Sequence, residues 1–103
     1  MVKKIYRANN RDGILIVFED GKQVGLTDIM RGVLQNTFRT QLENIKMHPI
    51  PQEEGALETR PDEVTEVIQK ETGYYLEVSG DKGDYDISVS PEELKTLIFL
   101  DDK

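Results

Sequence analysis

Two stretches of the sequence follow the same order, and this order limits the folds that are open to the chain. Each has short apolar segments separated by turns that contain glycine, followed by a polar residue and a segment with helical periodicity. The polar residues are Thr27 and Ser90, whose side-chain oxygens can accept hydrogen bonds from the first N–H groups of a helix. Short strands joined by tight turns pair as antiparallel meanders. We therefore expect an α+β fold of antiparallel β-meanders with two to three helices.

The first stretch, residues 1–46, predicts three strands. They are Val2–Ala8, Ile14–Phe18 and Gln23–Leu26, and the second is an unbroken run of β-branched and aromatic residues. Such a run is typical of a strand that is buried on both faces. Asp-Gly pairs precede the second strand and follow it, and glycine adopts the positive φ that a tight turn requires.

A helix over residues 28–46 should follow these strands. Its apolar residues recur three or four positions apart, so they are expected on one buried face. The opposite face is expected to be solvated and to carry Arg31, Gln35, Arg39 and Glu43. Pro49 and Pro51 prevent the helix from continuing further.

The second stretch is clearest at its end. Tyr74–Ser79 and Tyr85–Val89 read as strands, and Ser90 begins a helix with proline next and glutamate three residues later. This is the pattern of a capping box, in which two backbone donors are satisfied reciprocally. Residues 62–72 are ambiguous, because Val64, Val67 and Ile68 fit a helix as well as a strand. We favour the strand, because it matches the first stretch.

The chain is expected to form a single domain over residues 1–103, with half-repeats at 1–46 and 62–103 joined by a loop at 47–61. If the repeat is real, two β-β-β-α units pack about a pseudo-twofold axis. If the match is due to chance, the order is β-β-β-α-α-β-β-α. Either arrangement fits the length of 103 residues, which is too short for two independent cores.

Composition places the protein in a reducing compartment. The sequence has no cysteine and one histidine, so neither a disulfide framework nor a zinc site of thiolates is available. No apolar run is long enough to span a membrane, and no apolar segment follows the charged start as in a signal peptide. We expect a cytoplasmic protein that does not associate with membranes.

The net charge of −7 is unevenly distributed. Residues 1–52 carry +3 and residues 53–103 carry −10. An acidic half of this density repels nucleic acid and attracts basic partners. Direct binding of nucleic acid is therefore not expected, although basic residues gather near the N-terminus, at Lys3, Lys4, Arg7 and Arg11.

The sequence predicts no catalytic group, no cofactor and no metal site. His48 lies beside a proline in a loop, with no residue in the sequence pattern that would fix its tautomer. Asp81, Asp84 and Asp86 are spaced like calcium ligands, but Lys82 lies among them and an alternating strand begins at once, so a solvated hairpin is favoured. No glycine-rich phosphate loop is present.

These observations favour a small protein-interaction or regulatory module without catalytic activity, of bacterial or phage (mobile-element) origin. Its expected partner is a protein, most simply a basic one, and the opposite charges of the two halves also predict a homodimer. One alternative is an acidic inhibitor that mimics nucleic acid and binds a basic nuclease or DNA-binding protein. Another is a small carboxylate-dependent hydrolase.

The residues predicted to contact a partner combine apolar surface with acidic charge. They are Tyr74, Tyr75, Phe99, Leu100, Asp81, Asp84 and Asp86. For the inhibitor, the acidic groups are either the last three of these or Glu53, Glu54, Glu58, Asp62, Glu63 and Glu66.

Overall fold

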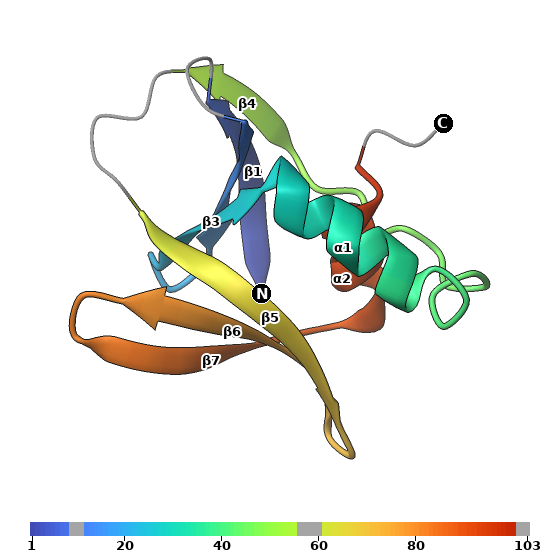
Figure 1. The fold of residues 1–103 in the computed structure, drawn as a ribbon. Coiled ribbons are helices and arrows are strands. Elements are labelled where there is room, and N and C mark those ends of the chain that lie inside the picture. The colour runs from blue at the N-terminus through green and yellow to red at the C-terminus, as the bar shows by residue number, and fades with distance from the viewer. Residues whose placement is uncertain (9–11, 56–60, 101–103) are drawn as a thin grey trace.

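Seven strands form one mixed sheet in the computed structural model, which describes residues 1–8, 12–55 and 61–100. The strand order is β4-β1-β2-β3-β5-β6-β7 (Figure 1). The strands are β1 (Val2–Ala8), β2 (Gly13–Phe18), β3 (Gln23–Thr27), β4 (Gln52–Gly55), β5 (Asp62–Lys70), β6 (Gly73–Gly80) and β7 (Gly83–Val89).

The two predicted meanders are present. β1, β2 and β3 pair antiparallel in sequence order, and so do β5, β6 and β7. The segment that was ambiguous in the sequence is strand β5, as we favoured. The α+β class is therefore confirmed. The sheet as a whole is mixed, because β4 joins β1 in parallel and β5 joins β3 in parallel.

The two meanders are joined through unlike strands. β3, the third strand of the first series, pairs with β5, the first strand of the second, at Val24–Asp62 and Gly25–Glu63. A twofold axis between the two series would bring like strands together at this junction. The observed order instead places the series one after the other across the sheet, and a duplication in the sequence stays a prediction.

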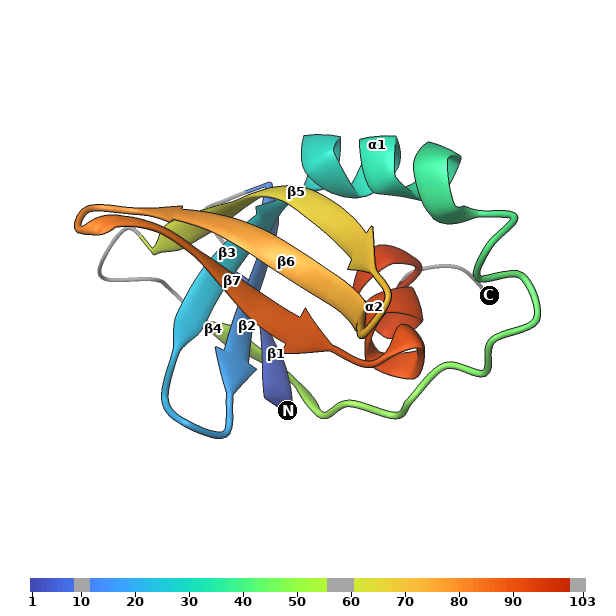
Figure 2. The same cartoon turned by 90° about the horizontal axis from the view of Figure 1, so that it is seen from below.

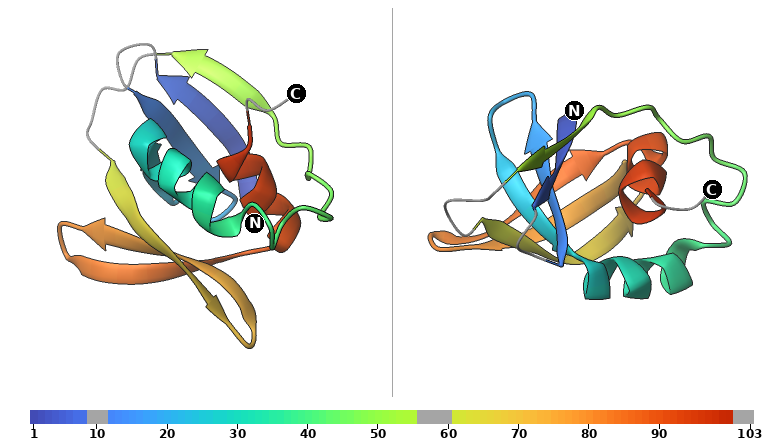
Figure 3. Two further views of the ribbon diagram at one scale, coloured as in Figure 1. Left: turned by 45° about the vertical axis from the view of Figure 1, so that its right-hand side comes forward. Right: turned by 90° about the horizontal axis from the view of Figure 1, so that it is seen from above.

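Two helices complete the fold among the described residues: α1 (Asp28–Phe38) and α2 (Pro91–Ile98). The sheet bends between its two meanders, and α2 lies inside the bend with α1 beside it (Figures 1 and 3). Leu94, Leu97 and Ile98 of α2 have no exposed surface. This helix therefore forms the centre of the core, against which the inner faces of both meanders pack.

Helix α1 differs from its prediction in length and in orientation. It ends at Phe38 rather than near residue 46, and Leu42 is buried from the turns that follow. The expected solvated face is also wrong at Arg31, which is 6% exposed, whereas Ile29 and Val33 are 84% and 52% exposed. The cause is packing against α2, which turns the arginine side of α1 inward.

Arg31 binds the carboxyl end of α2. Its Nε donates to Leu97 O at 3.1 Å and its Nη2 to Ile98 O at 3.5 Å, while Gln35 Nε2 donates to Ile98 O at 2.9 Å. The last carbonyls of a helix have no partner within the helix and carry a partial negative charge. A guanidinium supplies both the donors and the opposite charge.

The amino end of α2 is fixed by Glu93. The predicted capping box is present, with Ser90 Oγ accepting from Glu93 N at 3.1 Å and Glu93 Oε1 accepting from Ser90 N at 3.0 Å. The second carboxylate oxygen accepts from Val2 N at 2.7 Å, across 91 positions of sequence. Burial tends to raise the pKa of Glu93, but these hydrogen bonds outweigh it and lower the pKa below its ordinary value.

Strand β4 lies inside the segment predicted to be a loop at 47–61. Its residues are almost all exposed, so the sequence has no apolar pattern that would indicate a strand here. Backbone pairing to β1 defines the strand, and it is supported by the Lys4 Nζ–Glu53 Oε2 ion pair at 3.0 Å and by Arg7 Nε donating to Gln52 Oε1 at 3.2 Å. Residues 9–11 of the turn predicted at 9–13, residues 56–60 of the predicted loop (with Glu58) and the chain end at 101–103 lie outside the described residues.

We predict that Arg31→Met lowers the free energy of unfolding by about 2 kcal/mol, because two buried carbonyls lose their charged donor. Lys46→Met, at an exposed position, is the matched control and should change stability little. Urea denaturation followed by circular dichroism measures both. Equal effects of the two substitutions would contradict the role given to Arg31.

Glu93→Gln should also cost about 2 kcal/mol at neutral pH, because an amide offers one acceptor oxygen where the carboxylate offers two. The pKa of Glu93 is lowered on folding, so its contribution is complete above the ordinary value of 4.5 and is lost as the pH falls through the folded value. The difference between wild type and variant should therefore shrink in acid. Glu92→Gln, exposed at the next position, is the control, and a pH-independent difference would contradict the prediction.

Candidate functional site

The outer face of strands β5, β6 and β7 carries the most distinctive surface of the described residues. These strands lie in front in Figure 2, with α2 and the other strands behind them. Along β6 burial alternates, so that Tyr74, Leu76 and Val78 face the core while Tyr75 and Glu77 face outward. The register of the sheet then places outward residues of β5 and β7 directly beside them.

Three carboxylates stand side by side on this face. Glu66 of β5 pairs with Glu77 of β6, and Glu77 pairs with Asp86 of β7, so the three form one line across the strands. We call Glu66, Glu77 and Asp86 the acidic row. Side chains directly opposite in an antiparallel pair have their Cβ atoms about 5 Å apart, and like charges there destabilise the pair.

The like charges of the row also affect the pKa of its central residue, Glu77. Partial burial raises the pKa of Glu77, and the charges of Asp86, Glu66 and Asp84 raise it further. Each neighbour disfavours the charged form, because removing one negative charge relieves the others. The acidic row is therefore a place where the fold tolerates unfavourable electrostatics.

One cation of the chain already lies against the acidic row. Lys70 Nζ is 3.4 Å from Asp86 Oδ2 and 4.8 Å from the centroid of the Tyr75 ring. Tyr75 is held in place by a hydrogen bond of 2.6 Å between its hydroxyl and Thr72 Oγ1. An ammonium group between a carboxylate and an aromatic face is stabilised by both. The outer face of these strands therefore already binds one cationic group, the ammonium of Lys70.

The other predicted contact residues are divided between core and surface. Tyr74 and Phe99 are 8% and 4% exposed; Tyr74 packs edge-on against Phe38 with centroids 5.9 Å apart, and the Arg39 guanidinium lies 5.1 Å above the Phe99 ring. Leu100 packs partly buried against the core. Of the aromatic candidates, the acidic face therefore includes Tyr75 alone.

Asp81 and Asp84 lie at the end of the β6–β7 hairpin. With Asp62 and Tyr85 they line a hollow of about 490 Å³, which Lys82 also lines. Tyr85 donates its hydroxyl to Asp62 Oδ2 at 2.8 Å, and burial together with this hydrogen bond raises the pKa of Tyr85 to about 12. In the described part of the chain no three histidine, cysteine or carboxylate residues are placed to hold a metal ion.

The acidic residues considered for a nucleic-acid mimic are separated by the fold. Glu53 and Glu54 lie on β4, at the opposite edge of the sheet from Asp84 and Asp86 on β7. The outer face of the second meander combines Glu66 from one set with Asp84 and Asp86 from the other. Sequence reasoning missed Glu77, whose place in the row depends on strand register.

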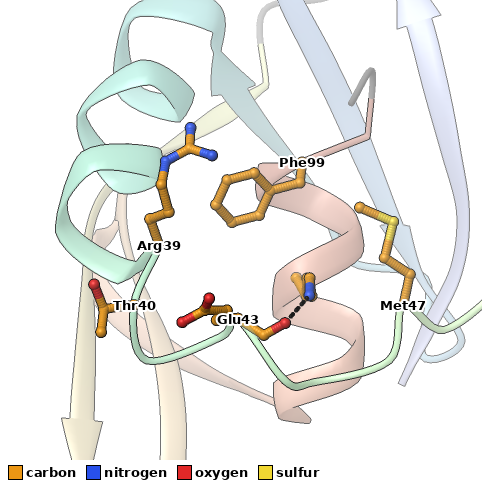
Figure 4. Close-up of a pocket in the computed structure, with 6 residues that line it drawn as sticks. Arg39, Thr40, Glu43, Met47 and Phe99 are labelled. Atoms are coloured by element: carbon orange, nitrogen blue, oxygen red, sulfur yellow. Dashed lines mark hydrogen bonds between the residues drawn. The ribbon is translucent and has the colours of Figure 1, made fainter. Parts of the chain in front are cut away.

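A second hollow, of about 440 Å³, lies between the end of α1 and α2 (Figure 4). Arg39, Glu43, Met47 and Phe99 line it, and Lys95 Nζ donates to Glu43 O at 3.0 Å. Its cations are already engaged, one over an aromatic ring and one with a backbone carbonyl.

Comparison of the chain with family models, curated proteins and solved structures gave no match. None of the helices in the described residues is long and apolar enough to cross a membrane.

Glu77→Gln is predicted to stabilise the protein at neutral pH, because it removes the central charge of the acidic row. The pKa of Glu77 is raised on folding, so the wild type loses stability as the pH rises from the ordinary value of 4.5 through the folded value. The advantage of the variant should thus appear only above that range. Denaturation midpoints at pH 4 to 8 measure it, with Glu19→Gln at an exposed turn as control. A variant that is less stable at pH 7 would contradict the repulsion.

Proposed function

We propose that the protein is a protein-binding module without catalytic activity, and that it binds a basic partner through the outer face of β5, β6 and β7. The acidic row is the observation that carries this proposal. Carboxylates in register on neighbouring strands lower the stability of the sheet. Positions that break a local rule of this kind are expected at functional sites, where a ligand offsets the cost.

The chemistry of the face favours a lysine or arginine side chain. Lys70 contacts one end of the acidic row, through Asp86. Among the described residues, no lysine or arginine forms an ion pair with Glu66 or Glu77. Tyr75 adds an aromatic surface next to the carboxylates, and Ile68 lies directly opposite Tyr75. Aromatic residues are enriched in protein interfaces relative to the rest of the surface.

The charge of the whole chain supports the same partner. The net charge is −7, and the half that contains this face carries −10. A field of this sign speeds the approach of a basic protein and makes its association sensitive to salt. It also repels nucleic acid and anionic lipid.

A narrower form of the proposal is the inhibitor that mimics nucleic acid, expected in a protein of phage origin. It requires that the basic surface of the partner be the one that binds nucleic acid. The acidic row and the nearby Asp84 support it, because they place several negative charges on one face. Competition between DNA or RNA and this protein for the same partner distinguishes the narrower form from the general one.

The remaining expectations stay predictions. The homodimer has one feature in its favour, the exposed apolar pair Ile29 and Val33 on α1. The hydrolase retains the hollow lined by Asp62, Asp81 and Asp84, although Asp62 is engaged by Tyr85. A cytoplasmic location also stays a prediction.

Removal of the row's charges tests the proposal. The variant Glu66→Gln, Glu77→Gln, Asp86→Asn loses three negative charges and keeps the shape of the side chains. A matched control, Glu19→Gln, Glu54→Gln, Glu92→Gln, loses the same charge at exposed positions elsewhere. Wild type, variant and control are each immobilised and used to capture proteins from a lysate of the cells in which the protein naturally occurs, at low and at high salt.

We expect a basic protein to be captured by wild type and control, and to be at least about tenfold depleted with the row variant, since each lost charge-assisted contact is worth about 1.5 kcal/mol or more. Capture should also fall with added salt. Equal capture by the row variant and the control would contradict the proposal.

A further inference from the structure

The open edge of the sheet at β7 has the features of a binding site for an extended peptide. β7 is the last strand of the sheet and pairs only with β6 among the described residues. Figures 1 and 3 show no helix or strand along its other side. The opposite edge is formed by β4, which has only four residues, whereas β7 has seven.

The register shows which backbone groups of β7 are free to bind. A two-residue turn joins the strands, so its flanking pair, Gly80 and Gly83, exchanges both backbone hydrogen bonds. Every second pair along the hairpin does the same. The residues between them, Asp84, Asp86 and Ser88, therefore direct their N–H and C=O groups away from β6, toward the open edge.

This edge is regular enough to accept another strand. The β6–β7 register continues over seven pairs with no bulge, whereas both β1–β2 and β5–β6 contain a register shift. β7 also contains no proline. Bulges and prolines are two of the features by which proteins prevent an edge from pairing, and β7 has neither.

The side chains of β7 specify the sequence of the added strand. Asp84 and Asp86 are exposed on the outer face, while Tyr85 and Ile87 face the core and stay partly exposed because no strand covers them. An added strand places alternate side chains beside these two sets. Basic residues fit the outer positions and apolar residues fit the inner ones.

Asp84 and Asp86 favour a different protein over a second copy of this chain as the strand that pairs with β7. Antiparallel pairing of two β7 edges about a twofold axis brings the aspartates of one copy opposite those of the other, and like charges in that position are destabilising. Edge charges of this kind oppose self-association. The same charges attract a strand that carries lysine or arginine.

We propose that the partner binds as an extended strand along β7, with basic and apolar residues in alternation, so that one basic side chain lies beside Asp86 and extends the acidic row. This inference rests on the proposed function and adds how the partner binds. Backbone hydrogen bonds supply affinity along the edge, and the alternating side chains supply specificity.

Synthetic peptides of about seven residues, matched to β7, test this binding mode. One alternates lysine and valine, and a second has the same composition with the lysines and valines in separate blocks. Both are blocked at their ends and titrated into the isotope-labelled protein. NMR shifts give the affinity, and hydrogen exchange reports on the amides of Asp84, Asp86 and Ser88.

We expect the alternating peptide to bind at least about tenfold more tightly than the block peptide and to slow exchange of those three amides. Two further alternating peptides carry N-methyl groups, either on every lysine or on every valine. In a bound strand, the backbone N–H groups of either the lysines or the valines point toward β7. Methylation of those N–H groups should abolish binding, whereas methylation of the others should leave the affinity unchanged. Loss with methylated lysines indicates antiparallel pairing, and loss with methylated valines indicates parallel pairing.

The outcomes separate the two proposals. Failure of the alternating peptide to bind, equal binding of alternating and block peptides, or an equal response to both methylated peptides would overturn the edge mode. If the variant Glu66→Gln, Glu77→Gln, Asp86→Asn still captures at least about tenfold less of the basic partner than its matched control, the acidic face remains the binding surface. If the variant captures the partner as well as the control does, the proposed function itself is overturned.

Discussion

The contact on which the rest of this fold depends is the one between the Arg31 guanidinium and the last carbonyls of α2. At the other end of the same helix, the Glu93 carboxylate binds the backbone of Val2 and Ser90. A cation at the carboxyl end and an anion at the amino end both complement the helix dipole. α2 is thus fixed at both ends by groups from distant parts of the chain. Since β7 leads directly into α2, this helix also positions the meander that carries the acidic row.

Because α2 lies on the inner side of β5, β6 and β7, the side chains on the outer side of these strands do not take part in core packing. Tyr74, Leu76 and Val78 complete the core from the inner side of β6, so the outward residues are not needed for packing. A row of neutral or oppositely charged residues would suit the sheet better there. The carboxylates present instead make this face less stable alone and more favourable with a cationic partner. Repulsion among the carboxylates also contributes to the raised pKa of Glu77. A bound proton and a bound cation both reduce this repulsion.

Local signals in the sequence were sufficient for most elements of the fold. The capping box at Ser90 and the glycine turn at Gly21 depend on residues within a few positions of one another, and the structure has both. Gly13 does not have the positive φ that was expected of it. The errors concern long-range packing. Arg31 lies on the polar side of a helical pattern, and only the neighbouring carbonyls of α2 make that side the buried one. β4 has no side-chain pattern at all, because backbone pairing with β1 defines it.

The candidate site shows the same division. Asp84 and Asp86 are recognisable as an exposed acidic pair on an alternating strand, but the acidic row also requires Glu66 and Glu77 from two other strands. Their alignment depends on the register of β5 against β6, which contains a bulge between Val64 and Glu66. Without that shift of one residue, the strand beyond it would present its opposite face. Identical sequences in another register would scatter the carboxylates over both faces, so the row is a property of the sheet and not of any one segment.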